Sequence, residues 1–380
     1  MVIYGLVEES ARRANREGVV RQDSKYPKAH ETHWFDPEGM RIVWQRMLDE
    51  AGVRTICNLT AGQPIVEEGR ISGVVVETKR GTKALTARII IDGTGDGDVA
   101  AKAGVPFDYG RPSDGRVQGM TLMYALWGIA EGARDEARDK DFDEVISHME
   151  QLRDAGEFPE FNVGNTRHHV RHAGDHDYWN MLPAAGNPLD EEQLTRLTAE
   201  SREKLVSYLK LWREELPGYA RARIEQTGFA LGVRESRRIR GRKTLNADMV
   251  LGAEKQPDAI GHGVWMIDIH DPEGSGYTTF SDRGDSNMLE TGTSYHIPLG
   301  MCLNDSVSNL GVVGRCASCT HEGLSSARVQ THCMVMGQGT GTAAALALQE
   351  GCGMHEVDVP ALQEVLREDG VYLEDVPKCP

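Results

Sequence analysis

The sequence of 380 residues contains no apolar run of about 18 residues, the length that a membrane-spanning helix requires. Its start, MVIYGLVEESARR, lacks the basic region and the long apolar core of an export signal. Basic residues are fewer than acidic ones, and the formal net charge is -16. Because nucleic acids and anionic membranes repel such a chain, we expect neither as a partner. These absences favour a cytoplasmic location.

Cysteine is also scarce. There are seven cysteines, an odd number, and only Cys316 and Cys319 lie close together. This distribution argues against a disulfide framework and favours reduced thiols. Glycine is frequent, with 42 residues against 15 prolines, and clusters after apolar runs, which predicts tight turns or close backbone contacts.

The first third of the chain predicts one helix followed by strands. Asp36 and Pro37 suit the first positions of a helix, and Gly52 suits its end. Between them apolar residues recur at helical spacing: Met40, Val43, Trp44, Met47, Leu48 and Ala51. The runs VRTIC, PIVE, ISGVVVE and ALTARIIID then predict a strand, a β-meander and a final buried strand.

The remainder predicts a helical insertion and a second unit of strand, glycine turn and helix. The segment 131–216 is polar and helical, with one apolar stripe made by Leu194, Leu197, Leu205, Leu209 and Trp212. NLGVVGR and CMVMGQGTGTAAALALQEG form a later strand and a helix whose small residues permit close packing. Two such units around an insertion predict an α/β nucleotide-type domain interrupted by a second domain.

The turn in RIIIDGTGDGDVAAKAG has three functional interpretations. A calcium loop requires a glutamate at its twelfth position, where Ala103 stands. A first Rossmann turn requires an acid about 20 residues further on, at the end of a strand, but Asp114 lies in a loop. A glycine turn can also bring backbone amides near a phosphate or a ribose. Alternatively, Asp96 or Asp98 merely caps a helix.

Four further motifs are candidates for chemistry. In GVRESRRIRGR, Arg234, Glu235 and Arg238 at helical spacing form either an anion clamp or a solvated face. In DIHDPEGSG, His270 suits a general acid or base, although a structural role is the alternative. The spacing of His168, His172 and His176 suggests a metal site. Cys316 and Cys319 suggest a redox pair or half of a zinc site, with His332 and Cys333 as distant ligands; the alternative is a pair of buried thiols.

Taken in order, IIDGTGDGDVAAKAGVPFDYGR, GVRESRRIRGRKTL, DIHDPEGSG and NLGVVGRCASCTHEGLSSARVQTHCMVMGQGTGTAAALA resemble the FAD-dependent oxidoreductase family of flavoproteins with two dinucleotide-binding domains. The resemblance implies an α/β fold: an incomplete, Rossmann-like FAD-binding domain with a β-meander and an inserted, mainly helical substrate or cap domain. We expect the FAD-binding domain at 1–125 and 301–352, the insertion at 126–300 and a C-terminal tail at 353–380.

The resemblance implies FAD held at an N-terminal G-x-G-x-x-G motif and at two further places. One is the turn Thr94, Gly95, Asp96 and Gly97. The other is the late turn together with the start of the following helix, comprising Gly314, Arg315, Thr331, Cys333, Gly337 and Gln338. The chain departs from the family at its start, which resembles the segment after the first motif. We therefore expect that a partner chain supplies the ADP-binding unit, that the reading frame is truncated, or that FAD is held weakly.

The implied reaction transfers a hydride between a small organic substrate and flavin N5. The arginines of GVRESRR, Arg234 among them, would clamp an anionic substrate or stabilise developing charge, and His270 or His321 would move the accompanying proton. Glu235 of the same segment is a further catalytic candidate. Arg328 would favour the reduced, anionic flavin or would pair with an acid of its loop. The alternatives are a non-catalytic subunit that needs a partner chain and a metal or thiol redox protein; a homodimer is compatible with either.

Overall fold

The computed structural model describes residues 3–21, 34–130, 138–158, 169–171, 176–273 and 287–374. The chain divides into two compact units. Unit 1 comprises 1–115, 235–268 and 279–380, and unit 2 comprises 116–234 and 269–278. The predicted insertion at 126–300 thus overlaps unit 2 in sequence, and the predicted domain boundaries stay predictions. None of the described helices is both long and apolar enough to cross a bilayer.

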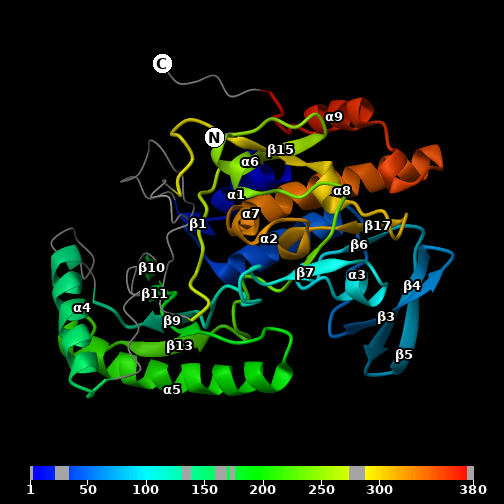
Figure 1. The fold of residues 1–380 in the computed structure, drawn as a ribbon. Helices are drawn as coiled ribbons and strands as arrows, with labels where there is room; N and C mark the ends of the chain where they lie inside the picture. The colour runs from blue at the N-terminus through cyan, green and yellow to red at the C-terminus, as the bar shows by residue number, and fades with distance from the viewer. Residues whose placement is uncertain are drawn as a thin grey trace. The chain divides into compact units, whose positions relative to one another are not determined.

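Unit 1 combines helices with several small sheets (Figure 1). Its helices are α1 (Leu6–Arg16), α2 (Pro37–Glu50), α3 (Asp98–Lys102), α6 (Ala247–Leu251), α7 (His321–Ala327), α8 (Gln330–Glu350) and α9 (Val359–Glu368), with 3-10 turns η2 (Leu299–Cys302), η3 (Gly314–Cys316) and η4 (Met354–Glu356). Its strands are β1 (Val20–Arg21), β2 (Trp34–Phe35), β3 (Thr60–Glu67), β4 (Arg70–Thr78), β5 (Gly81–Thr86), β6 (Ile90–Asp92), β7 (Phe107–Tyr109), β14 (Arg237–Ile239), β15 (Ala259–Gly263), β16 (Tyr295–Pro298) and β17 (Leu310–Val312).

The strands of unit 1 pair mostly in antiparallel fashion. β3, β4 and β5 form the predicted meander, and β1–β2, β7–β14 and β15–β16 are antiparallel pairs. β6 and β17 pair in parallel. A buried apolar cluster lies beneath this parallel pair and α3, and it includes Val99, Ala100, Ile239, Val312 and Cys316. The cluster fixes the ends of both parallel strands.

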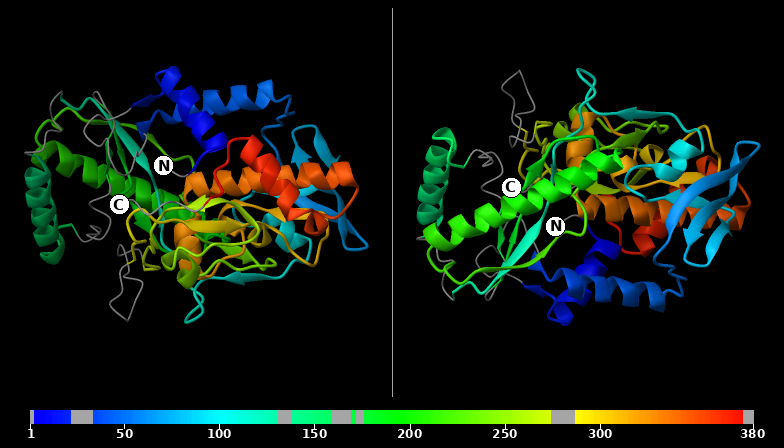
Figure 2. Two further views of the ribbon diagram at one scale, coloured as in Figure 1. Left: turned by 90° about the horizontal axis from the view of Figure 1, so that it is seen from above. Right: turned by 90° about the horizontal axis from the view of Figure 1, so that it is seen from below.

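Helix α8 packs against β15 and α9 (Figure 2). Its small residues permit this close approach, as predicted: a Cβ built on Gly339 would lie 2.5 Å from the Ile260 Cβ of β15. A Cβ built on Gly311 of β17 would likewise lie 2.7 Å from the Thr340 side chain of α8. The helix therefore lies directly on the strands that precede the late glycine turn.

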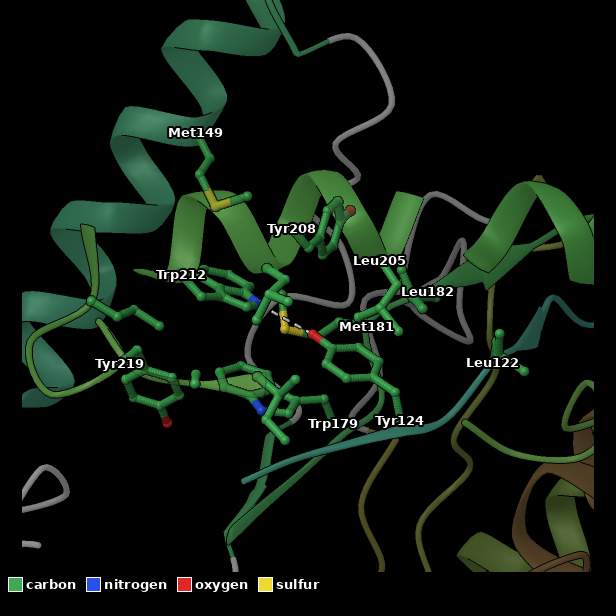
Figure 3. Close-up of a cluster of buried hydrophobic side chains, with 14 of the residues drawn as sticks. Leu122, Tyr124, Met149, Trp179, Met181, Leu182, Leu205, Tyr208, Trp212 and Tyr219 are labelled. Atoms are coloured by element: carbon green, nitrogen blue, oxygen red, sulfur yellow. Dashed lines mark hydrogen bonds between the residues drawn. The ribbon is translucent and has the colours of Figure 1, made fainter. Parts of the chain in front are cut away.

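Unit 2 has an aromatic core (Figure 3). The Trp212 ring stacks on Trp179 with 5.2 Å between centroids, and its Nε1–H donates to the Tyr124 hydroxyl at 3.2 Å. The elements of this unit are β8 (Met120–Thr121), β9 (Tyr124–Trp127), α4 (Arg138–Asp154), β10 (His169–Arg171), β11 (His176–Trp179), β12 (Pro183–Ala184), α5 (Glu191–Glu215) and β13 (Arg223–Thr227). Strands β10, β11, β9 and β13 form one sheet in that order.

Several local predictions are confirmed. α2 begins after Asp36, whose carboxylate accepts from the Glu38 amide at 3.0 Å, with Pro37 in its first turn. α5 buries Leu197, Leu205 and Trp212 along one stripe. These features need only neighbouring residues, so the sequence pattern suffices to predict them.

Three local predictions are wrong. VRTIC, residues 53–57, is exposed and has no ladder partner among the described residues, so it forms no strand. Arg234, Glu235 and Arg238 do not lie on a helix, because the segment extends into β14, where β7 supplies the hydrogen bonds. The segment 131–216 is not helical throughout, because it contains strand β11, which begins at His176. His168 and His172 lie outside the described residues.

Candidate functional site

The candidate site lies in unit 1, where the two parallel strands end. In this pair Leu310 lies opposite Ile90 and Val312 opposite Asp92, and the Val313 amide donates to the Asp92 carbonyl at 3.0 Å. The glycine turns that follow β6 and β17 therefore begin at the same edge of this sheet. The carboxyl ends of neighbouring parallel strands are where open α/β sheets bind ligands.

The first turn is held by the buried Asp92 carboxylate. Its Oδ1 accepts from the Thr94 amide at 2.9 Å and from the Thr94 hydroxyl at 2.7 Å. Its Oδ2 accepts from the amides of Val99 at 3.0 Å and Ala100 at 2.8 Å, in the first turn of α3. The alternative in which Asp96 or Asp98 caps this helix is therefore wrong. Its first amides donate instead to Asp92, the last residue of strand β6.

Glycine is required at two positions of this turn. Gly95 has φ of 83° and Gly97 has φ of 65°, values that side-chain-bearing residues rarely adopt. A Cβ on Gly95 would also collide with the Arg315 guanidinium, and one on Gly97 would lie 3.0 Å from Ile239. The amides of both glycines turn inward to the thiol of Cys316. The backbone of the turn is thus packed from below and crossed by one arginine.

Asp96 joins three segments of the chain. Its Oδ1 accepts from the Ser236 hydroxyl at 2.6 Å and lies 3.1 Å from Arg315 Nη1. Arg237 donates to the Asp96 carbonyl at 3.0 Å and to the Asp98 carboxylate at 2.9 Å. The structure thus brings together the predicted Thr94 to Gly97 turn and the predicted Arg315.

The start of α8 lies beside the second turn. Gly314 has φ of 82°, and a Cβ built there would lie 3.9 Å from Cys333 Sγ. Thr331 and Cys333 lie in the first turn of α8, whose amides have no side-chain cap at Val329. The sequence-predicted residues Gly314, Arg315, Thr331 and Cys333 are therefore neighbours.

Gln338 and Gly337 lie one turn further along α8. The Gln338 side chain accepts from the Leu6 amide at 2.9 Å and so caps α1, whose own N-cap residue is Gly5. Apart from its chain neighbours and the backbone of its own helix, no described atom lies within 4 Å of a Cβ built on Gly337. Gln338 therefore has a structural contact that its predicted role in cofactor binding did not include.

Glu235 is fully buried between the side chains of Arg238 and His321. One carboxylate oxygen bonds the Arg238 guanidinium, and the other lies 2.8 Å from Nδ1 of His321. Arg238 also donates to the carbonyls of Cys319 at 3.0 Å and Gly110 at 2.8 Å. Arg238 thus links β14 to the backbone at Cys319 and Gly110, whereas Glu235 and His321 form a carboxylate–imidazole pair.

Arg328 pairs with an acid, but this acid comes from a segment 60 residues away and not from its own loop, as the sequence alternative had it. Its Nη2 donates to the Asp268 carbonyl at 2.8 Å and lies 3.4 Å from the Asp268 carboxylate. Both side chains are 11% exposed. The positive charge just ahead of α8 is therefore partly neutralised.

Arg234 and His270 lie in unit 2. The Arg234 guanidinium donates to the Gly119 carbonyl at 2.7 Å and lies 3.2 Å from the Asn180 side-chain oxygen. The His270 amide donates to the Gln118 side chain at 3.2 Å. Both side chains are buried, which suits residues with fixed orientation.

Burial raises the pKa of three of the candidate thiols. Burial raises the pKa of Cys316 to about 12 and that of Cys333 to about 11, and it raises the pKa of Cys319 further. Neutral thiols are weak nucleophiles. Within the described part of the chain, no three His, Cys, Asp or Glu residues gather as metal ligands.

Three residues of the site were missed by the sequence reasoning. Asp92, Ser236 and Arg237 hold the first turn, yet only Asp92 had a readable signal, as the acid that directly follows an apolar strand. Ser236 and Arg237 come from a segment 140 residues away, so no local pattern predicts their partners.

A family model described as FAD dependent oxidoreductase matches residues 1–366. The chain belongs to this family. Its cofactor is FAD, and its function is flavin redox chemistry. A search of curated protein sequences finds no match.

Two solved structures are distantly similar to this chain. The myxobacterial chondrochloren halogenase CndH, described as a variant of FAD-dependent halogenases, is 12% identical with a TM-score of 0.45, over 96% of this chain and 67% of that one. L-proline dehydrogenase from P.horikoshii is 12% identical with a TM-score of 0.31, over 89% of this chain and 61% of that one.

The residues at the joined strand ends fit this cofactor. Arg315 and Arg237 supply positive charge beside a turn that also presents the Asp96 carboxylate, 24% exposed. A dinucleotide carries both phosphates and hydroxyl groups, and this mixture of cations and carboxylate matches both. The Asp92 carboxylate already accepts hydrogen bonds from Thr94 and from the first amides of α3, so we do not assign it to the cofactor.

Proposed function

We propose that this chain catalyses hydride transfer between a small organic substrate and flavin. The observation that supports the proposal is the meeting of two glycine turns at the carboxyl ends of β6 and β17. FAD, when bound, supplies the flavin N5 that accepts or gives the hydride. Thr94 to Gly97, Gly314, Arg315 and the first turn of α8 would hold it, with Gly337 and Gln338 further along the helix.

We assign the accompanying proton to His321. Its Nδ1 faces the Glu235 carboxylate at 2.8 Å, and a ring oriented in this way presents Nε2 for proton exchange. Glu235 would fix the ring and balance its charge. His270 is the alternative donor.

We assign the binding of an anionic substrate to Arg234. Two of its bonds, to the Gly119 carbonyl and the Asn180 side chain, already hold the guanidinium in one orientation. A planar guanidinium presents its donors in a fork whose geometry matches a carboxylate. The positive charge of Arg328 would favour a reduced, anionic flavin, although the Asp268 carboxylate 3.4 Å away offsets part of this charge.

We further propose that residues 126–300 form the substrate or cap domain of a cytoplasmic enzyme, between FAD-binding segments 1–125 and 301–352 and ahead of a tail at 353–380. The four-stranded sheet and the long helix α5 of unit 2 support a separately packed second domain. A homodimer is compatible with this arrangement.

The purified chain tests the proposal when it is incubated with FAD and desalted. We expect the visible absorption of bound oxidised flavin, and its bleaching when a suitable organic substrate is added without oxygen. R234A should raise KM for an anionic substrate, and H321Q should lower kcat with little change in KM. Retained flavin that no substrate reduces would contradict catalysis, and unchanged turnover in R234A would remove Arg234 from the active site.

A second candidate is a flavoprotein subunit that needs a partner chain. It is favoured by the sheet of β6 and β17, which has two strands among the described residues, while Ile91 at its edge is 37% exposed. Parallel sheets are normally buried and usually contain more strands. If the isolated chain binds FAD only at millimolar concentration, this candidate is supported; micromolar or tighter binding would contradict it.

A further inference from the structure

The amides at the start of α3 are used within the protein. The amides of Val99 and Ala100 donate to Asp92, and the Asp98 amide donates to the Thr94 hydroxyl at 2.9 Å. The amides of Gly95 and Gly97 face the Cys316 thiol. The turn therefore offers a ligand few backbone donors, and its chemistry depends on side chains.

Asp96 is the side chain that remains available. Asp92 is buried and saturated, and Asp98 is paired with Arg237. The contacts of Asp96 with Ser236 and Arg315 both use Oδ1. Among the described residues none bonds its Oδ2, which can accept a hydrogen bond from a ligand hydroxyl.

Ser236 and Arg315 approach this carboxylate from separate segments. Ser236 is fully buried just ahead of β14, and its hydroxyl donates to Oδ1 at 2.6 Å. Arg315 lies in η3 and crosses Gly95 to reach the same oxygen. Together they restrict rotation of the carboxylate and stabilise its negative charge.

We propose that Ser236 and Arg315 are positioning residues that hold the Asp96 carboxylate ready to accept a hydroxyl group of the bound dinucleotide. This inference rests on the proposed function, because it assigns the first turn to FAD. Ser236 is buried and acts through Asp96 alone, whereas Arg315 acts through Asp96 in addition to the cofactor contact proposed above. Removing either one would leave Asp96 held by a single side chain and would weaken FAD binding without disturbing the fold.

The test is a set of thermodynamic cycles on the dissociation constant of FAD, measured on the full chain. D96N, S236A and R315Q are each measured alone, and S236A and R315Q are each combined with D96N. We expect S236A and R315Q each to weaken FAD binding about fivefold. Because Ser236 acts only through Asp96, S236A should not weaken binding further in the D96N background. The loss of affinity caused by R315Q should be smaller in the D96N background than in the wild type.

S236T, which keeps the hydroxyl, should restore most of the affinity lost in S236A. S201A is the matched control, since Ser201 is a buried serine of α5 in unit 2 and should leave the FAD dissociation constant within twofold. The melting temperature of each chain without FAD reports folding, and if S236A does not fold, S236T and the R315Q cycle carry the test.

Two results would overturn the inference alone: wild-type affinity in both single variants, or full additivity with D96N while the wild-type chain binds FAD. Failure of the wild-type chain to bind FAD at any concentration would overturn the inference and the proposed function together. The two failures are therefore distinguishable from one titration series.

Discussion

Acid should destabilise unit 1 through His332, which is fully buried at the start of α8. Its Nε2 accepts from the Val264 amide at 3.1 Å, and its Nδ1 donates to the Ser326 carbonyl at 3.0 Å. Only the neutral ring with its proton on Nδ1 makes both bonds. Burial lowers the pKa of His332 from 6.5 to about 4.

The size of the effect follows from this difference. The unfolded chain binds a proton at His332 below about pH 6.5, whereas the folded chain resists protonation down to about pH 4. The stability that the neutral ring supports is therefore present above pH 6.5 and is lost as the pH falls towards 4. Between pH 7 and pH 5 the free energy of unfolding should fall by about 2 kcal/mol on account of this residue, at about 1.4 kcal/mol per pKa unit.

Denaturant unfolding of the wild type and H332Q at pH 7 and at pH 5 measures this directly. H332Q should be less stable at pH 7, because glutamine cannot reproduce both bonds, but its loss between the two pH values should be smaller by about 2 kcal/mol. His262, whose pKa burial lowers to about 3, contributes equally to both proteins and cancels. H355Q, at an exposed histidine, should behave as the wild type. Equal acid losses in H332Q and the wild type would refute the reasoning.

Three further changes test the packing around the site and in unit 2. D92N replaces an acceptor of four hydrogen bonds with a group that also donates, and should lower the free energy of unfolding by about 3 kcal/mol and weaken FAD binding; an unchanged melting temperature would contradict the capping role. Q338A removes the cap of α1 and should cost about 1 kcal/mol in chemical denaturation, with Q338E, which keeps an acceptor, losing less. W212A should cost about 4 kcal/mol in unit 2 and leave the melting of unit 1 unchanged, and a single shifted transition for the whole chain would count against separate units.

Short-range patterns were sufficient for α2, α5 and the meander. α2 and α5 are specified by a capping aspartate and an apolar stripe, both of which lie within the element itself. The same kind of pattern failed for residues 53–57 and for 234–238. A strand depends on a partner elsewhere in the chain. Residues 53–57 have no such partner among the described residues and are irregular, whereas Arg237 and Arg238 pair with β7 and form strand β14.

The sequence by itself determined that glycines follow two apolar strands, that α8 can approach other elements closely, and which family the chain resembles. Tertiary structure alone decided that β6 and β17 are parallel neighbours, so that their turns meet, and that Asp92 takes the helix amides while Asp96 faces Ser236 and Arg315. The reason is physical: glycine and strand propensities act over a few residues, whereas the partner of a buried carboxylate is set by which distant segments the core packs together.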